Sequence, residues 1–146
     1  MEKKRQQKRV LETIRITDDG GVLKKVFRYG ESSGEDTIPI PGQEIVIAYE
    51  CRLESGSVVD SWREHIKNKD VRTTDEGLKL VVGMGNVIEG WDMGLLTMRL
   101  GEVCDLHITS KYAFGDEGRP PKIPPKANVI FSIELLQIGD RKSKKP

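Results

Sequence analysis

The side chains that most often carry out chemistry are few and scattered in this sequence. His65 and His107 have no Cys, Asp or His at the spacing of metal ligands, and each is better interpreted as an ordinary surface or core histidine. Ser57, Ser61 and Ser110 lack the sharp strand–helix turn that exposes a serine nucleophile. The sequence therefore disfavours a hydrolase or a metalloenzyme, and it predicts no metal and no cofactor.

Residues 83–85 read Gly-Met-Gly and invite a nucleotide-binding interpretation. They stand between a strand-like and a helix-like run, as the first glycines of a dinucleotide fingerprint do. The third glycine of that fingerprint would have to replace Ile88, but it stands at Gly90 instead. A phosphate loop ending in Gly-Lys-Ser or Gly-Lys-Thr does not occur either. What remains is a binding function, or a reaction that needs no nucleophile.

Trp91 is the strongest candidate for the centre of such a site. A strand-like run at Leu78–Val82 precedes it, and a helix is predicted over residues 87–98. Asn86 is the expected N-cap of that helix, and Glu89 can reach back to it as in a capping box. The apolar face of the helix turns the indole inward, where it forms either part of the core or the floor of a pocket.

Strand-like alternation dominates the rest of the chain, and turn signals such as Asp-Asp-Gly-Gly at residues 18–21 separate the runs. Several antiparallel strands with one short helix predict an α+β fold, in which a curved β-sheet packs on the helix that covers its apolar face. The predicted strands are Val10–Ile16, Val22–Tyr29, Glu44–Leu53, Ser57–Asp60, Leu78–Val82, Glu102–Ser110 and Asn128–Ile138.

Length and composition fit one soluble domain in a chain of 146 residues, of which 36% are hydrophobic and 32% charged. We expect the domain to span residues 10–139. No run approaches the ~20 apolar residues of a membrane span, and the first residues lack the apolar core of a signal peptide. Cys51 and Cys104 lie in strand-like runs and are better interpreted as reduced thiols than as a disulfide, which favours a cytoplasmic location.

Basic residues cluster in a predicted N-terminal tail at residues 1–9 and in a predicted C-terminal tail or linker at residues 140–146. Solvated tails, or a linker to a neighbouring domain, are the favoured interpretation. A nuclear localisation signal, or a contact with nucleic acid or an acidic membrane, is the alternative. The net charge of +1 gives no general attraction to nucleic acid, so nucleic-acid and membrane partners are disfavoured.

Four short segments together point to a family. They are residues 58–61 (Val-Val-Asp-Ser), 87–91 (Val-Ile-Glu-Gly-Trp), 112–118 (Tyr-Ala-Phe-Gly-Asp-Glu-Gly) and 122–125 (Lys-Ile-Pro-Pro). In this order they resemble the FKBP-type peptidyl-prolyl isomerases, the immunophilins that bind tacrolimus and rapamycin, over about Asp19 to Ile138. The resemblance implies an antiparallel half-barrel wrapped around one short helix. It also implies isomerase activity on X–Pro bonds of polypeptides, macrocyclic immunosuppressants as ligands, and chaperone partners.

Residue by residue, the resemblance assigns the catalytic positions to Asp60, Trp91 and Phe114. Trp91 corresponds to the tryptophan at the floor of the family's pocket, and Asp60 to the buried carboxylate near the substrate carbonyl. Phe114 stands where the family usually has a tyrosine whose hydroxyl hydrogen-bonds the ligand. The substrate- and ligand-binding positions that the resemblance implies are Tyr49, Val59, Leu78, Leu80, Val87, Ile88, Ile123 and Phe131.

The chain departs from the family's pattern around this pocket. Val59, Leu78 and Leu80 stand where active members usually have aromatic residues, and Cys51 stands near a usual glycine. Because Phe114 also lacks the hydroxyl, we expect a wider pocket, reduced activity and weakened macrocycle binding, since a lost hydrogen bond costs about 1 kcal/mol. The alternative is a largely non-catalytic protein-binding or chaperone module of the same fold.

The segment between Asp60 and Leu78 is longer than is usual in the family. Trp62 within it is a candidate exposed aromatic, which would cover the pocket or meet a partner. Whether Arg63 or Arg72 pairs with Asp60 stays open at this point. Domains of this kind often belong to larger co-chaperones, and the basic C-terminal residues are compatible with a junction to a further region.

Overall fold

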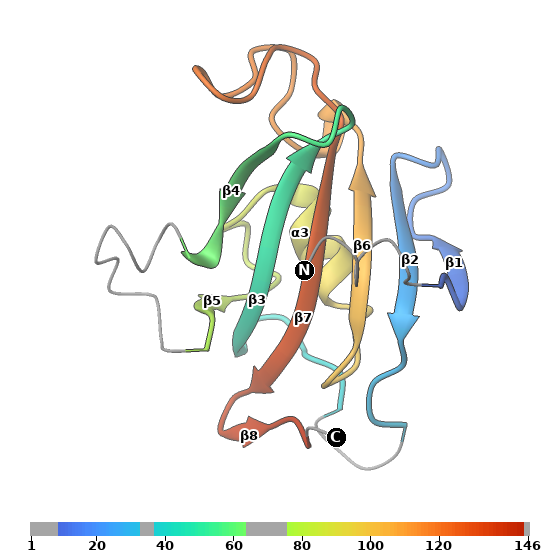
Figure 1. Cartoon of the computed structure of the whole chain (residues 1–146). Coiled ribbons are helices and arrows are strands. Elements are labelled where there is room, and N and C mark those ends of the chain that lie inside the picture. Colours follow the sequence, from blue (N-terminus) through green and yellow to red (C-terminus); the bar gives the residue numbers. More distant parts are fainter. Residues whose placement is uncertain (1–8, 33–36, 64–75, 145–146) are drawn as a thin grey trace.

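The strands form one open, curved antiparallel sheet, and a short helix lies behind its central strands (Figure 1). The structure is a computed structural model and describes residues 9–32, 37–63 and 76–144. Within these residues eight strands belong to the sheet, in the order β1-β2-β6-β7-β3-β4, while β5 also pairs with β3 and β8 with β7. The α+β fold expected from the sequence is confirmed.

Strand bounds follow the predicted runs most closely at the centre of the sheet. β3 (Glu44–Leu53) has the predicted bounds, and β7 (Val129–Ile138) starts one residue later than predicted. The short β8 (Arg141–Lys142) lies in the segment that the sequence suggested as a tail or linker, and it pairs with the end of β7. The other strands are β1 (Glu12–Arg15), β2 (Val22–Arg28), β4 (Val58–Ser61), β5 (Leu78–Val81) and β6 (Val103–Ile108).

The central strands β3 and β7 carry the core on one face because their apolar residues alternate. Ile47 pairs with Leu135, and Cys51 pairs with Phe131 four pairs further along. All four side chains are buried. A shift of one residue in register would turn this apolar set to the solvent face, so the alternation itself specifies the pairing.

The helix α3 (Glu89–Leu95) is shorter than the predicted helix over residues 87–98. Its N-cap is Ile88, and no side chain makes a capping hydrogen bond, so the predicted capping role of Asn86 is wrong. After Leu95 the chain continues in tight turns, in which the backbone N–H of Met98 donates to the carbonyl of Leu95 at 3.2 Å. The apolar periodicity therefore extended beyond the regular helix at both ends.

Asp92, in the first turns of α3, holds the loop that precedes the helix. Its carboxylate accepts hydrogen bonds from the backbone N–H groups of Gly83 and Gly85, both at 2.8 Å. Both glycines have positive φ angles, +80° and +76°, which a residue with a Cβ adopts only at a cost. An acid within the helix thus orders the loop before it, while the helix itself begins without the side-chain cap that was predicted.

Two glycines on α3 allow the helix to lie close to β6. A Cβ on Gly94 would lie 2.5 Å from Leu106 Cδ1, and a Cβ on Gly90 would lie 2.6 Å from Ile108 Cγ2. Any larger residue at these positions would push the helix away from the sheet. This close approach sets the depth at which Trp91, the neighbour of Gly90, enters the core.

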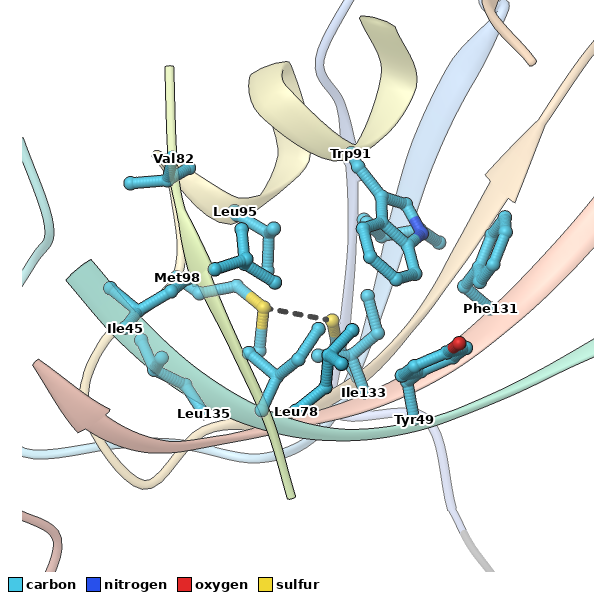
Figure 2. Packing of buried hydrophobic residues seen from close by; sticks show 14 of the residues in the cluster. Ile45, Tyr49, Leu78, Val82, Trp91, Leu95, Met98, Phe131, Ile133 and Leu135 are labelled. Atoms are coloured by element: carbon cyan, nitrogen blue, oxygen red, sulfur yellow. Dashed lines mark hydrogen bonds between the residues drawn. The ribbon is translucent and has the colours of Figure 1, made fainter. Parts of the chain in front are cut away.

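The core fills the space between α3 and the sheet (Figure 2). Leu95 and Met98 lie near Ile45 and Leu135, and all four are fully buried. Deleting such a side chain costs about 2–5 kcal/mol because the surroundings collapse only partly into the cavity that is left. The core therefore provides a rigid base for the residues at its open end.

Cys51 and Cys104 are both buried and free, which confirms the prediction of reduced thiols. The pKa of the Cys51 thiol is raised to about 12, mainly because the thiol is buried. Burial raises the pKa of Cys104 as well. Both residues behave as small apolar side chains in this core.

Several features singled out in the sequence fall outside the described residues, namely residues 1–8, His65 and Arg72. Trp62, expected as an exposed aromatic, is instead partly buried and packs against the core. In the described part of the chain, no helix has the length and apolar character needed to cross a membrane.

Candidate functional site

Trp91 lies at the open end of the core, where α3 meets β3 and β7. Its indole stands edge-on to Tyr49 and to Phe131, with ring centroids 4.8 and 4.9 Å apart and interplanar angles of 80° and 74° (Figure 2). Perpendicular aromatic pairs of this kind each contribute about 0.5–1.5 kcal/mol beyond their buried area. The two contacts therefore hold the indole in one orientation.

The indole N–H of Trp91 is buried and has no acceptor among the described residues. A buried donor without a partner costs about 1–3 kcal/mol. Such unpaired groups are rare in native interiors and call for an explanation. Here the unpaired donor belongs to a residue that lines a cavity.

Two adjoining cavities open at this end of the core, and both are partly apolar. The first, which we call the Trp91 cavity, has a volume of about 200 Å³. The second, the Ile123 cavity, has a volume of about 270 Å³. The Trp91 cavity is lined by Tyr49, Asp60, Leu78, Leu80, Asn86, Val87, Ile88, Trp91, Phe114, Arg119 and Phe131. The Ile123 cavity is lined by Cys51, Val59, Asp60, Phe114, Arg119, Pro120, Pro121, Lys122, Ile123 and Phe131.

Asp60 stands between the two cavities and lines both. It lies on β4, which pairs with β3, and the Tyr49 hydroxyl on β3 donates to its Oδ2 at 2.9 Å. The backbone N–H of Ser61 donates to its Oδ1 at 2.9 Å. These bonds orient the carboxylate, so that it presents a fixed acceptor and a fixed field to whatever enters the cavities.

The loop after β6 supplies the opposite wall. It begins with a 3₁₀ helix, η1 (Ser110–Tyr112), and continues through Phe114 to Ile123. Within it Arg119 and Ile123 form a two-way backbone bridge, with N–H to O distances of 2.8 and 3.1 Å. The Arg119 guanidinium lies 5.8 Å from the centroid of the Phe114 ring, a cation–π distance.

Asp19, in the turn between β1 and β2, anchors the start of this loop. The Tyr112 hydroxyl donates to its Oδ2 at 2.8 Å, and Lys111 Nζ lies 3.2 Å from the same oxygen. Thr17 and the backbone of Gly21 donate to its other oxygen. The hydrogen bond from Thr17, followed by the others, holds the pKa of the Asp19 carboxyl well below its usual range. The loop that carries Phe114 is thereby tied to a distant turn.

All the side chains that the sequence assigned to the site line one or both cavities. Asp60, Phe114 and Phe131 line both. The Trp91 cavity takes in Tyr49, Leu78, Leu80, Val87, Ile88 and Trp91, and the Ile123 cavity takes in Val59 and Ile123. The structure thus brings together residues that are spread over more than eighty positions of the sequence. Their roles in binding or catalysis stay predictions.

The sequence reasoning missed Arg119 and its neighbours. Arg119 lines both cavities, and Pro120, Pro121 and Lys122 line the Ile123 cavity. Arg119, Pro120 and Pro121 fall in the gap between two motifs, the aromatic turn at residues 112–118 and the Lys-Ile-Pro-Pro segment, and Lys122 is the first residue of the second motif. The one signal for them was their place in a loop between Phe114 and Ile123, two predicted wall residues, although residues 115–118 of the same loop line neither cavity.

Comparison with known proteins decides the family. A family model described as FKBP-type peptidyl-prolyl cis-trans isomerase matches residues 35–136, which is well over half of the chain. The chain belongs to this family.

Similar curated proteins agree with the assignment. This FKBP-type chain is 39% identical, over 84% of its length, to FK506-binding protein 59 of Drosophila melanogaster. It is 38% identical, over 82% of its length, to the peptidyl-prolyl cis-trans isomerase FKBP4 of Mus musculus, and 36% identical, over the same share, to that of Homo sapiens. The matched region covers 25% of the fly protein and 23% of each mammalian one, so the chain spans about a quarter of the length of these relatives.

Proposed function

We propose that this FKBP-type domain binds X–Pro segments of polypeptides and catalyses their cis/trans isomerisation. The observation that carries the proposal is the Trp91 cavity, an aromatic-floored recess with Asp60 oriented at its edge. Its volume of about 200 Å³ suits a group the size of one side chain. The relatives whose printed name is peptidyl-prolyl cis-trans isomerase support the same activity.

Such a cavity suits a reaction that needs no acid, base or nucleophile. The barrier to rotation about the peptide bond is roughly 18–20 kcal/mol because rotation breaks the amide resonance. The twisted amide separates less charge than the planar one, so an apolar recess that excludes water favours the transition state over the ground state. In this proposal Trp91 supports the proline ring, and Asp60 faces the amide that rotates.

The walls of the cavity support an activity below that of typical members. Leu78 and Leu80 border the Trp91 cavity and Val59 borders the Ile123 cavity, at positions where aromatic rings are usual in the family. Phe114 carries no hydroxyl to hydrogen-bond a ligand. A missing hydrogen bond costs about 1 kcal/mol, which corresponds to roughly fivefold in affinity. We extend the proposal to weakened binding of macrocyclic immunosuppressants.

The same changes favour a second candidate, a protein-binding or chaperone module with little catalysis. The chain spans about a quarter of its relatives, so the partners of a longer protein, chaperones included, are proposals as well. A cytoplasmic or nuclear location is a further proposal, and the free, buried thiols support a reducing compartment.

A protease-coupled assay on a prolyl tetrapeptide tests the isomerase proposal and separates the two candidates. We expect the folded protein to accelerate isomerisation measurably above the uncatalysed rate. The matched control is His107→Gln, because His107 projects from β6 on the face opposite to the buried Leu106 and Ile108 and should leave the rate unchanged. A rate at background with folded protein, together with binding of the same peptide seen by Trp91 fluorescence, would leave only the binding module.

A further inference from the structure

Arg119 is a cation at the mouth of both cavities. It is exposed, and it is one of four residues that the two cavities share. Its guanidinium lies over the ring of Phe114, which itself forms part of both walls. Arg119 therefore borders the boundary between the two cavities, together with Asp60, Phe114 and Phe131.

The guanidinium of Arg119 differs from most other described arginines in its partners. Arg28, Arg52 and Arg141 each pair with a carboxylate, at N–O distances of 2.9, 2.9 and 2.6 Å. Among the described residues, the Arg119 guanidinium has neither a carboxylate partner nor a hydrogen bond, and its contact is the Phe114 ring. Its five N–H donors are therefore available to an anion.

Arg119 is also held in place before any ligand arrives. Its backbone makes two hydrogen bonds with Ile123, and its guanidinium lies 5.8 Å from the centroid of the Phe114 ring. Ordering a long side chain on binding costs about 0.5–1.5 kcal/mol, and prior ordering reduces this cost. A planar guanidinium presents its donors as a fork, which matches carboxylate and phosphate oxygens.

The local charge favours an anion at this position. Lys122 is a second cation on the rim of the Ile123 cavity. Asp60 is the acid that lines the cavities, and its two oxygens already accept hydrogen bonds from Tyr49 and Ser61. Arg119, Lys122 and Asp60 are the charged residues among those that line the two cavities, and together they carry a formal net charge of +1.

We infer that Arg119 makes this domain prefer X–Pro segments in which the residue before the proline carries an anionic side chain, a carboxylate or a phosphate. The inference rests on the proposed function. With the proline ring in the Trp91 cavity, the preceding residue is the nearest in the chain, and its side chain reaches the mouth of the Ile123 cavity under Arg119. The rotating bond joins these two residues, so a contact with the preceding side chain can act on the transition state as well as on binding.

The test compares kcat/KM for tetrapeptides Ala-X-Pro-Phe that differ in charge but not in size at X. We expect Glu to exceed Gln about threefold at low salt, the ratio of an exposed ion pair, and the preference to disappear in 1 M salt. Phosphoserine compared with Ser at X forms a second arm, and the arm with the larger ratio of kcat/KM identifies the preferred anion.

Variants of Arg119 test the source of the preference. In Arg119→Gln both ratios should fall to about one, and in Arg119→Glu the kcat/KM for peptides with Lys at X should exceed that for peptides with Gln.

Lys126→Gln provides the matched control, because it removes the same charge from the same loop at a residue that lines neither cavity. It should keep the preference for Glu. Measurable isomerisation with equal rates for Glu and Gln, or a preference that survives in Arg119→Gln, would overturn the inference and leave the proposed function intact. If no peptide is turned over, the proposed function fails, and the Glu-to-Gln ratio of peptide affinities, read from Trp91 fluorescence, decides the preference by the same criterion.

Discussion

Polar side chains are used differently on the outer face of the sheet and at the two cavities. On the outer face, Arg52 pairs with Asp105 at 2.9 Å, and the Ser132 hydroxyl donates to the same carboxylate at 2.7 Å. At the cavities, the indole N–H of Trp91 and the guanidinium of Arg119 have no hydrogen-bond partner among the described residues. Strands β3 and β7 contribute side chains to both regions, because successive residues of a strand point to opposite faces of the sheet.

The difference shows which polar groups serve the fold and which are available for binding. A polar group that is already hydrogen-bonded within the protein has few donors or acceptors available to a ligand. Removing its partner leaves a buried charge or dipole without a hydrogen bond, which destabilises the fold. The buried indole N–H of Trp91 costs stability because it has no partner, whereas the exposed guanidinium of Arg119 keeps its donors available to a ligand. Variants of each kind should therefore affect different measurements, stability in one case and binding or rate in the other.

The largest expected effect comes from the most deeply buried pair, Lys24 and Glu102. Their side chains are only 3% and 5% exposed, and Lys24 Nζ lies 2.8 Å from Glu102 Oε2. Lys24→Met should lower the free energy of unfolding by about 3–5 kcal/mol, because it leaves the Glu102 carboxylate buried without its cation. Urea unfolding measures this, with Lys25→Met on the opposite face of β2 as control. A decrease in the free energy of unfolding below about 1 kcal/mol would contradict the division into polar groups that serve the fold and polar groups that are available for binding.

Trp91→Leu should act mainly on function. It removes the aromatic floor and both perpendicular ring contacts, each of which contributes about 0.5–1.5 kcal/mol. We expect kcat/KM in the isomerase assay to fall at least about tenfold, which corresponds to about 1.4 kcal/mol. Trp62→Leu is the matched control, since Trp62 lines neither cavity. Equal rates for the two variants would show that the indole is core rather than floor.

Phe114→Tyr should have a smaller effect in the opposite direction. The added hydroxyl restores a hydrogen-bond donor at the wall shared by the two cavities. We expect the affinity for a macrocycle such as rapamycin to increase about fivefold, the value of roughly 1 kcal/mol for one hydrogen bond. Fluorescence titration of Trp91 measures it. An unchanged affinity would mean that the hydroxyl position lies outside the path of the ligand.

The smallest effect belongs to the outer face. Burial of His107 on β6, followed by the charge of Lys25, lowers the pKa of the imidazole below its ordinary value of about 6.5. The unfolded chain therefore binds the proton more readily, so stability should fall slightly as the pH drops from about 6.5 through the folded pKa. In His107→Gln the free energy of unfolding, measured by urea at several pH values, should depend less on pH in this range, while kcat/KM stays unchanged. An identical slope in the variant would exclude His107 as its cause.

Strands were easier to predict than the helix for a physical reason. The bounds of β3 were predicted to the residue, because a strand with one buried face shows a regular alternation of apolar and polar residues in the sequence. The helix was predicted over residues 87–98 but spans Glu89–Leu95. Its ends depend on which group satisfies the free backbone N–H groups. No side chain caps α3, and the Asp92 carboxylate instead accepts hydrogen bonds from Gly83 and Gly85 in the preceding loop, so the local rule that favoured Asn86 did not apply.

The candidate site was predicted only as far as motifs reached. Trp91, Asp60 and Phe114 belong to segments with a family pattern, and their positions around the cavities follow from it. Arg119 carries no pattern of its own. Its importance comes from the backbone bridge to Ile123, which turns the loop so that the guanidinium lies at the mouth of both cavities.

By itself the sequence determined the class of fold, the alternating core of the central strands and the residue types around Trp91. These depend on local periodicity and short motifs, which are written in neighbouring residues. The tertiary structure decided which polar groups find partners. Arg52 meets Asp105 and Arg119 meets an aromatic ring through contacts between segments far apart in the chain. Spacing along the sequence carries no information on such meetings, because they are set by how the sheet curves and how the loops close over it.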